Sequence, residues 1–209
     1  MDDATLFEIF TTPIYATKLN IDLDRLIQLA DDEGYKEPIG RKVSNIGGYQ
    51  TSNLDYNKYK FLFDEIFPHT EQYLKIFNYK SHVTLHLENF WINVNRYRDF
   101  NILHHHLAPG STHFLNGVLY LKTPQNCGNI IFEHPFGFID SFYATQHIEP
   151  NKYIQQSVNQ VPEEKLLLII PSYLKHFVEP NMSQEDRISL AFNMSIKYDS
   201  VNRSNNGNI

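Results

Sequence analysis

The sequence predicts a mainly β protein of the sandwich, jelly-roll or barrel class, with a helical part near its N-terminus. After residue 80, apolar and polar residues alternate with the period of two that half-buried strands show. Turn-forming residues, such as Pro109-Gly110 and Pro135 to Gly137, separate these alternating runs. Over residues 20–30 and 56–77, apolar residues recur at helical spacing instead. Runs of short strands joined by such turns are typical of sandwiches and barrels.

The chain opens with an expected strand over residues 6–18. Pro13 interrupts it, which fits an edge strand because proline cannot donate a hydrogen bond to a neighbouring strand. An amphipathic helix is expected next, with Asn20 or Asp22 as its N-terminal cap and apolar residues on one face as far as Ala30.

The middle of the chain changes from loop to helix and then to strands. Residues 35–53 are expected to be rich in loops. Residues 56–77 predict either one long helix or two, because Pro68 can break a helix or begin a new one. Six strands are then expected, at residues 83–87, 91–95, 114–121, 129–132, 165–170 and 188–196.

Length and composition predict one globular domain. The 209 residues are 42% hydrophobic and include 15 Phe and 13 Tyr, enough for a sizeable core. We assign residues 1–198 to this domain, with helical support over about 20–78 and a β core over about 80–198. The polar, Asn-rich segment 199–209 is expected to be a disordered tail.

The net charge and the cysteine count limit which partners and which cellular compartment the sequence predicts. The net charge of −6, without a run of Lys or Arg, argues against nucleic acid as a partner. A single cysteine, Cys127, excludes an internal disulfide framework and fits a reducing compartment. The start at Met1 has no signal-peptide pattern, and no apolar run is long enough to span a bilayer. We therefore expect a cytoplasmic protein without a membrane partner, and a homodimer stays open.

Three histidines form the strongest candidate site. His104 and His106 lie two positions apart on an extended segment, where side chains alternate faces, so both can reach one metal ion. His176 follows 70 residues after His106 on a second apolar segment and is expected to face them. Three ligands on one face of the metal leave positions open for a 2-oxo acid and dioxygen, as in non-haem iron oxygenases. His105 points the other way.

Arg187 and Ser189 form a candidate carboxylate site near the C-terminus. A guanidinium binds a carboxylate with two parallel hydrogen bonds, and a hydroxyl two residues later on the same strand face can add a third. Taken singly, such residues more often make ion pairs or pack in the core, so the prediction rests on their combination with the histidines. Further candidates for the same pocket are Tyr120, Asn93, Asn95, Asn116 and Asn193.

These motifs resemble the 2-oxoglutarate and iron(II)-dependent oxygenase superfamily, in its prolyl-hydroxylase-like branch. The sequence is most similar to a largely uncharacterised subgroup found in bacteria and phages, with likeness also at Leu6–Tyr15 and Ser44–Ser52. The resemblance thus reaches from the N-terminal half to about residue 198. The segments that carry it are His104-x-His106, Asn116-Gly-Val-Leu-Tyr-Leu, Gly128-Asn-Ile-Ile-Phe, Pro171-Ser-Tyr-Leu-Lys-His176-Phe-Val and Arg187-Ile-Ser-Leu-Ala-Phe-Asn193.

The resemblance implies a double-stranded β-helix, the cupin-like jelly roll, with flanking N-terminal α-helices. It implies hydroxylation of a substrate C–H bond with dioxygen, releasing succinate and CO2, in a bacterial cytoplasm or in a host cytoplasm if a phage encodes the chain. No catalytic residue beyond the metal ligands is expected. Iron(II) would be bound by His104, His106 and His176, and 2-oxoglutarate by Arg187, Ser189, Tyr120, Asn193, Asn116 and Asn93.

One position departs from the superfamily and keeps alternatives open. His106 stands where most members have Asp or Glu, so the metal preference and the binding of a third ligand are in question. One alternative is a cupin-like three-histidine metalloenzyme that does not use 2-oxoglutarate, with Arg187 binding the substrate's own carboxylate. Another is a non-catalytic jelly-roll binding protein. The substrate stays open between a peptidyl residue, a free amino acid and another metabolite. The segment 133–161 is long enough for a lid over it.

Overall fold

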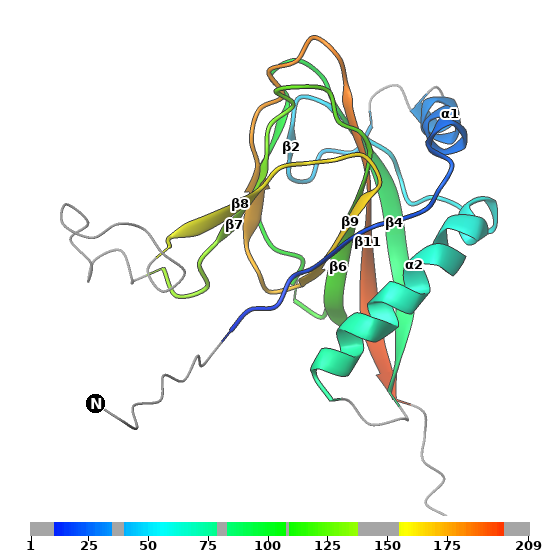
Figure 1. Ribbon diagram of the computed structural model, residues 1–209, viewed down its shortest axis with the longest axis vertical. Coiled ribbons are helices and arrows are strands. Elements are labelled where there is room, and N and C mark those ends of the chain that lie inside the picture. The colour runs from blue at the N-terminus through cyan, green and yellow to red at the C-terminus, as the bar shows by residue number, and fades with distance from the viewer. Residues whose placement is uncertain (1–10, 35–39, 79–82, 108, 138–154, 199–209) are drawn as a thin grey trace, which may run out of the picture.

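The structure, a computed structural model, describes residues 11–34, 40–78, 83–107, 109–137 and 155–198. Two antiparallel sheets form its body, and two helices flank them (Figure 1). The helices are α1 (Leu23–Gly34) and α2 (Tyr56–Ile76). The strands are β1 (Tyr15–Lys18), β2 (Asn45–Ile46), β3 (Tyr49–Gln50), β4 (Val83–Asn95), β5 (Phe100–His104), β6 (His113–Lys122), β7 (Ile130–Glu133), β8 (Ser157–Gln160), β9 (Leu166–Pro171), β10 (His176–Val178) and β11 (Arg187–Tyr198).

The strand order confirms the predicted double-stranded β-helix. The larger sheet has the order β1-β9-β6-β11-β4-β3, and the smaller has β2-β5-β10-β7-β8. Neighbours in each sheet are mostly distant in sequence, so the chain crosses between the two sheets as it winds around the molecule. The strands thereby bring the middle of the chain beside its C-terminal part.

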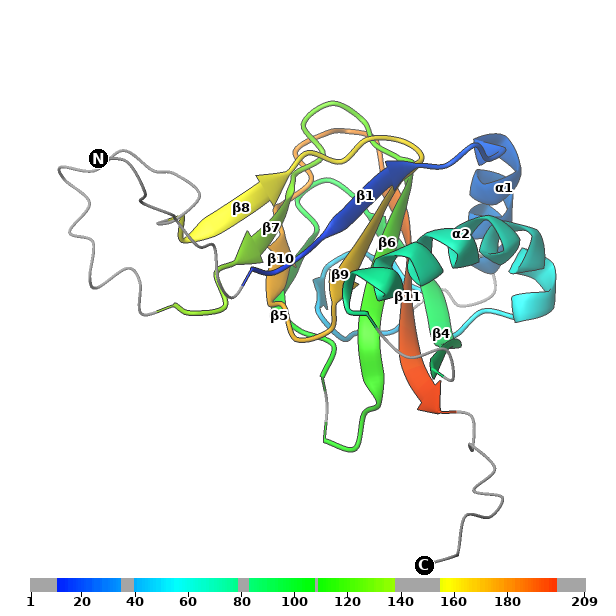
Figure 2. The ribbon, with the colours of Figure 1, turned by 60° about the horizontal axis from the view of Figure 1, so that its bottom comes forward.

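Both helices lie over the outer face of the larger sheet, as Figures 1 and 2 show. The apolar stripe of α2 packs there, with the ring of Phe63 centred 4.7 Å from Phe90 of β4 and 5.9 Å from Phe192 of β11. Full burial of each such side chain stabilises the fold by about 1.5–3 kcal/mol. This cluster leaves the opposite, inner face of the larger sheet for a second core and for a pocket.

The helix over residues 56–77 is a single one. It continues through Pro68 to Ile76, and the side chain of Asp55 caps its start by accepting from the backbone N–H of Asn57. A proline inside a helix removes one backbone hydrogen bond. The buried side chains of Phe63, Ile66 and Tyr73 lie on both sides of Pro68, and their packing holds the helix together there.

Several strands differ from the expected ones. The two strands expected at 83–87 and 91–95 are one 13-residue strand, β4. β2 and β3 lie in the segment expected to be loop-rich, and β8 lies in the expected lid. Of the strand expected over residues 6–18, only Tyr15–Lys18 forms β1, and the described residues 11–14, which include Pro13, are not in a strand. Residues 1–10, 138–154 and 199–209 lie outside the described part. In the described residues, no helix is both long and apolar enough to cross a membrane.

Candidate metal centre

Two of the three histidines come from neighbouring strands of the smaller sheet. His104 is the last residue of β5 and His176 the first of β10, and the two residues pair directly across the antiparallel ladder. We expected their segments to face each other, but they lie side by side in one sheet. The ring centroids of His104 and His176 are 4.4 Å apart as a result.

His106 lies beyond the end of β5, in a bend, and not on the strand that carries His104. Its backbone N–H donates to the carbonyl oxygen of Ser172 at 3.0 Å, which holds the bend against the segment leading to β10. One ligand atom from each of His104, His106 and His176 then lies within 4.8 Å of the other two. The structure therefore brings the three predicted side chains together, although the backbone between His104 and His106 is not a continuous strand.

Each of the three imidazoles has Nδ1 against a carbonyl-type oxygen. The partner of His104 is the backbone oxygen of Ile102 at 2.7 Å, and that of His176 is the backbone oxygen of Leu174 at 3.0 Å. Such an oxygen can only accept, so Nδ1 carries the hydrogen and Nε2 keeps its lone pair for a metal. The partner of His106 is a side-chain oxygen, Oδ1 of Asn193, at 2.5 Å.

The surroundings keep the three imidazoles neutral. Burial, together with the nearby His176 and His104, lowers the pKa of His106 to about 3. Burial and the neighbouring His104 lower the pKa of His176 to about 4, and burial also lowers the pKa of His104. Only a neutral imidazole can bind a metal ion, so all three are ready ligands at neutral pH. The donor set and its hydrogen bonds therefore fit an iron(II) ion.

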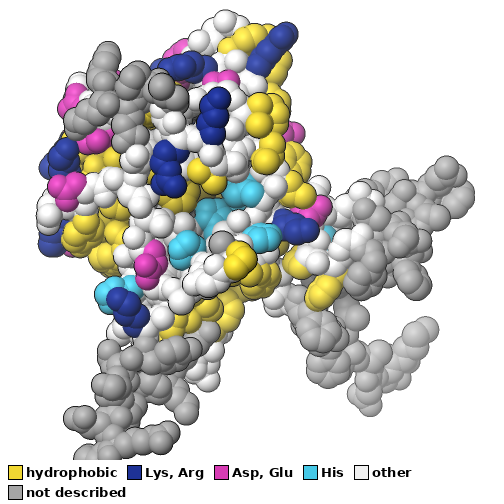
Figure 3. Space-filling view, turned by 180° about the vertical axis from the view of Figure 1, so that it is seen from behind, with side chains coloured by type: hydrophobic (Ala, Val, Ile, Leu, Met, Phe, Trp, Pro, Cys, Tyr) yellow, Lys and Arg dark blue, Asp and Glu magenta, His cyan; other side chains and the backbone are white. Residues whose placement is uncertain are grey.

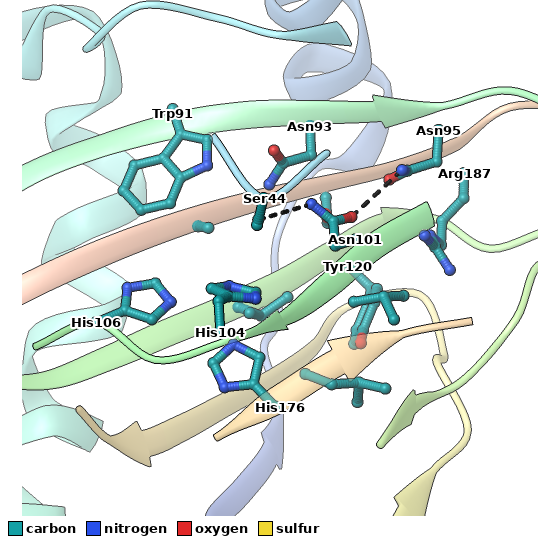
Figure 4. Close-up of a pocket in the computed structure, with 15 residues that line it drawn as sticks. Ser44, Trp91, Asn93, Asn95, Asn101, His104, His106, Tyr120, His176 and Arg187 are labelled. Atoms are coloured by element: carbon teal, nitrogen blue, oxygen red, sulfur yellow. Dashed lines mark hydrogen bonds between the residues drawn. The ribbon is translucent and has the colours of Figure 1, made fainter. Parts of the chain in front are cut away.

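A pocket runs from the histidines to Arg187 between the two sheets. Figure 4 shows the three imidazoles at one end and the guanidinium at the other, with Asn93 and Tyr120 between them. No side chain in its lining is acidic, among the residues that the structure describes. The lining consists of Ser44, Trp91, Asn93, Asn95, Asn101, His104, His106, Val118, Tyr120, Ile130, His176, Val178, Arg187, Ser189 and Ala191.

Arg187 is almost fully buried, with 2% of its surface exposed. Its Nη1 donates to the backbone oxygens of Cys127 at 2.6 Å and Gly128 at 3.2 Å, and weakly to that of Glu179 at 3.5 Å. Its Nη2 is buried and has no hydrogen-bond partner among the described residues. Burial lowers the pKa of Arg187, but arginine stays charged at neutral pH. A buried cation with a free donor is a binding position for an anion.

The other expected co-substrate residues divide into two groups. Tyr120, Ser189 and Asn93 line the pocket, and Oδ1 of Asn93 has no partner within the described chain. Burial raises the pKa of Tyr120, so its phenol stays protonated and can donate. By contrast, Asn116 and Asn193 lie outside the pocket lining. Asn116 is fully buried, and neither of its amide atoms has a partner among the described residues.

The structure places Asn95 in the pocket lining, as expected from the sequence, and adds Asn101 and Ser44, to which we assigned no role. Nδ2 of Asn95 donates to Oδ1 of Asn101 at 3.3 Å, and Nδ2 of Asn101 donates to the hydroxyl of Ser44 at 3.1 Å (Figure 4). This chain of hydrogen bonds joins β4, β5 and the segment before β2 along one wall. Asn101 shares a strand with His104, but Ser44 is 60 residues away in sequence, so only the fold could reveal it.

The metal end of the pocket is close to the surface. His104 and His106 are only partly buried, whereas His176 is 2% exposed. Figure 3 shows histidine side chains at the surface near the middle of one face of the molecule. A substrate can therefore approach the metal side, while Arg187 lies at the deep end.

Comparison with known proteins identifies a family whose model covers the segment that carries the site. Residues 89–193 match the model of a family described as "Putative 2OG-Fe(II) oxygenase". This match includes the three histidines and Arg187. No curated protein matches the sequence.

Solved structures show the same fold at low sequence identity. A Trichoplax adhaerens prolyl hydroxylase, in complex with a hypoxia inducible factor peptide fragment, has a TM-score of 0.65 and 12% identity, over 88% of this chain and 84% of that chain. A Pseudomonas putida prolyl-4-hydroxylase has a TM-score of 0.56 and 14% identity, over 88% and 93%. HygX from Streptomyces hygroscopicus, with nickel and 2-oxoglutarate bound, has a TM-score of 0.55 and 10% identity, over 88% and 83%.

Proposed function

We propose that this chain, which belongs to the 2OG-Fe(II) oxygenase family, uses dioxygen to hydroxylate a C–H bond of its substrate, with one oxygen atom going to the product and the other to succinate as 2-oxoglutarate loses CO2. Membership of the family makes the chain an oxidoreductase that depends on iron(II) and 2-oxoglutarate. The reaction at carbon and the assignment of residues to roles are our proposal. Three features of the pocket support it: the histidines, the buried arginine and the apolar lining between them.

His104, His106 and His176 would hold the iron(II) ion through their Nε2 atoms. Their Nδ1 hydrogen bonds hold each ring in place, which limits the rearrangement that metal binding would require. When bound, iron(II) supplies the activation of dioxygen that protein side chains cannot perform. Trp91, whose ring stacks at 6.1 Å on that of His106, covers one side of this cluster.

The free donor of Arg187 is the observation that carries the proposal. Its Nη1 is held by backbone oxygens, so the guanidinium has a fixed position, and the unpaired Nη2 is left for a ligand. An ionised donor buried without a partner is costly, and a carboxylate from the pocket would remove that cost. We therefore assign the distal carboxylate of 2-oxoglutarate to Arg187, with its other end at the histidines.

Hydrogen-bond donors near this path would fix the same molecule further. The hydroxyls of Tyr120 and Ser189 lie in the lining with Arg187 and would donate to the distal carboxylate. Asn93 lies between the metal end and Arg187, where its amide would bond the middle of the co-substrate (Figure 4). Val118, Ile130 and Val178 complete the lining with apolar surface, which excludes water and strengthens the polar contacts.

A succinate-release assay tests this function. The protein, with iron(II), 2-oxoglutarate and ascorbate, is incubated with pools of peptides, amino acids and other metabolites. Substrate-dependent succinate, together with a product heavier by one oxygen atom in mass spectrometry, is the expected result. Succinate with an unsaturated or epimerised product would contradict hydroxylation but keep the oxygenase. Activity that is independent of 2-oxoglutarate would instead favour a three-histidine enzyme of the cupin type.

Arg187 variants test the carboxylate assignment. Arg187→Met keeps an unbranched apolar stem but removes the guanidinium and its charge-assisted hydrogen bonds, which are worth about 1.5–3 kcal/mol each. The concentration of 2-oxoglutarate for half-maximal succinate release should therefore rise at least about tenfold. Arg187→Lys should recover only part of this loss, because an ammonium lacks the planar fork. Arg98→Met, at an exposed arginine, is the matched control and should behave like the wild type. An unchanged 2-oxoglutarate dependence in Arg187→Met would reject Arg187 as the anchor.

A further inference from the structure

Asn193 is expected from the sequence to face the co-substrate, but its side chain bonds to a metal-site histidine. Its Oδ1 lies 2.5 Å from Nδ1 of His106, and its Nδ2 donates to Oδ1 of Asn89 at 2.9 Å. Asn193 belongs to β11 and Asn89 to β4, and the two residues pair directly in the register of the larger sheet. The sheet therefore fixes the pair of asparagines against the bend that carries His106.

The two ends of the Asn193 amide have opposite chemical consequences for His106. With Oδ1 toward the ring, Nδ1 must carry the hydrogen, and Nε2 is free to bind a metal. With Nδ2 toward the ring, Nδ1 would accept, the hydrogen would move to Nε2, and the ring could not serve as a ligand. Asn89 offers its oxygen to Nδ2 of Asn193, so Nδ2 points away from His106.

The other two histidines do not need such a device. Backbone oxygens of Ile102 and Leu174 fix His104 and His176, and a backbone oxygen cannot be exchanged for a donor by rotation. His106 is also the ligand that stands where most of the superfamily has an acidic residue. An acidic ligand has no tautomers, whereas an imidazole in its place needs a fixed one.

We propose that Asn193, oriented by Asn89, is a positioning residue that makes His106 a metal ligand by fixing its Nδ1–H tautomer. The proposal rests on the metal site described under the proposed function. It adds that a histidine can replace the usual acidic ligand at position 106 because this pair of asparagines on the larger sheet fixes its tautomer. Partners that orient metal ligands typically change metal affinity by 10–100-fold when they are removed.

Metal binding by Asn193 variants is the first test. Calorimetric titration of the metal-free protein with cobalt(II), a stand-in for iron(II) that is stable in air, measures affinity without catalysis. Asn193→Leu should bind cobalt(II) about 10–100-fold more weakly, because nothing then fixes the tautomer. Asn193→Asp should bind at least as tightly as the wild type, because a carboxylate can only accept the Nδ1 hydrogen. Asn159→Leu, on the exposed strand β8, is the matched control and should match the wild type.

Asn89 variants separate orientation from packing. Asn89→Asp keeps an acceptor for Nδ2 of Asn193, so cobalt(II) affinity should stay at the wild-type value. Asn89→Leu removes that acceptor, lets the Asn193 amide turn over, and should weaken binding. Equal effects of Asp and Leu at this position would contradict the proposed role. The same applies if Asn193→Leu weakens binding as much in a His106→Ala background as it does alone.

The tautomer itself can be observed in the metal-free protein. Nitrogen-15 NMR of the imidazoles distinguishes Nδ1–H from Nε2–H, and His106→Ala identifies the signals of His106. The wild type and Asn193→Asp should show the Nδ1–H form, and Asn193→Leu a mixture that includes Nε2–H. A wild type with Nε2–H at His106, or unchanged cobalt(II) affinity in Asn193→Leu, would overturn this proposal alone. Failure of the wild type to bind any metal would overturn the metal site and this proposal with it.

Discussion

At the level of single residues, the chemistry of this protein depends on where each imidazole carries its hydrogen and on one unpaired guanidinium nitrogen. Three oxygens hold Nδ1 of the three histidines, and backbone oxygens hold only one side of Arg187. The Nη2 atom of Arg187 is thereby left without a hydrogen-bond partner in the described chain, and one nitrogen of each imidazole lies within 4.8 Å of the other two. A buried donor without a partner is costly, so Nη2 of Arg187 indicates an anionic ligand in the pocket, and the three clustered nitrogens indicate a metal ion.

His106→Asp tests whether this position contributes a ligand. If it does, a carboxylate there should keep or strengthen iron(II) binding, because it returns the usual donor and adds a negative charge next to the metal. If His106 only lines the pocket, the affinity should stay roughly the same. His106→Asn is the control, because asparagine has the same size as aspartate but carries no charge. Anaerobic equilibrium dialysis with iron(II) measures the three affinities, and a tighter complex for the aspartate than for the asparagine variant is expected.

The lowered pKa values of His106 and His176 predict acid sensitivity of the metal-free protein. Their folded pKa values are about 3 and about 4, whereas histidine in an unfolded chain has a pKa of about 6.5. Between about pH 6.5 and 4 the unfolded chain therefore binds protons that the folded chain does not, so stability falls as the pH falls.

Urea unfolding of the metal-free protein at a series of pH values measures this effect. The unfolding equilibrium constant should rise by up to about tenfold per pH unit for each of the two histidines below about pH 6.5. Above that pH the two histidines should contribute no slope. His176→Leu removes one of the groups and should flatten the profile. A profile identical to that of the wild type would show that His176 is not held neutral by the fold.

Residue types in a pattern predicted the histidines and Arg187, but not every neighbour. His104, His176 and Arg187 were found because their chemistry is rare and their order is informative. Asn193 was expected in the pocket, since it shares a strand face with Arg187 and Ser189. The sequence could not show that His106 would lie in a bend, close enough for its ring to form a hydrogen bond with the side chain of Asn193. Ser44 and Asn101 have common side chains, and no spacing marks them.

At the level of elements, the pairing of β6 with β11 sets the position of β11, which carries Arg187, relative to Tyr120 of β6. Gly117 of β6 pairs with Phe192 of β11, and a Cβ atom at Gly117 would overlap the Phe192 ring. That ring also packs on Phe63 of α2, so it has little room to move. The glycine therefore allows the helix, the ring and the two central strands to pack together.

Gly117→Ala should destabilise the protein by about 1–3 kcal/mol, because an overpacked core forces side chains off their preferred rotamers. Guanidinium unfolding of the metal-free protein measures the change. Phe192→Leu in the same chain should recover part of the loss, since the smaller side chain leaves room for the new methyl group. Gly137→Ala, where an added Cβ meets nothing within 4 Å, is the control. No rescue by Phe192→Leu would show that the strain lies elsewhere.

The long elements could be predicted from periodicity, and the short ones could not. β6, β9 and β11 carry alternating or continuous apolar runs that are long enough to recognise. β2, β3 and β10 have two or three residues each, too few for a period, and pairing with distant strands creates them. Because of Pro68, the sequence predicted either one helix or two in this segment. The structure has one, α2, and buried side chains pack on both sides of the proline.

At the level of the whole molecule, metal binding should stabilise the fold, because its ligands come from β5, the following bend and β10. A ligand at about 100 times its dissociation constant stabilises the folded state by about 2.7 kcal/mol. For a domain of this size, each kcal/mol raises Tm by about 2–4 °C. Manganese(II) should therefore raise Tm by roughly 5–11 °C at that concentration, and EDTA should reverse the shift. His176→Ala should show no shift, and an equal shift in this variant would place the metal elsewhere.

The fold class could be predicted from the sequence because a double-stranded β-helix consists of many strands that are separated by recognisable turns. The site depends on pairings between distant segments, such as His104 with His176 and Asn193 with Asn89. These pairings follow from the order of strands in each sheet, which periodicity alone does not contain. Resemblance to a known family supplied that order before the structure did.

The most direct test of the account is anaerobic titration of the iron(II)-loaded wild type with 2-oxoglutarate, followed by visible absorption. The account predicts a metal-to-ligand charge-transfer band that saturates at one 2-oxoglutarate per chain. The band should be absent in His176→Ala and should need at least about ten times more 2-oxoglutarate in Arg187→Met. A wild-type protein that binds iron(II) but develops no band would contradict binding of the 2-oxo acid at this metal.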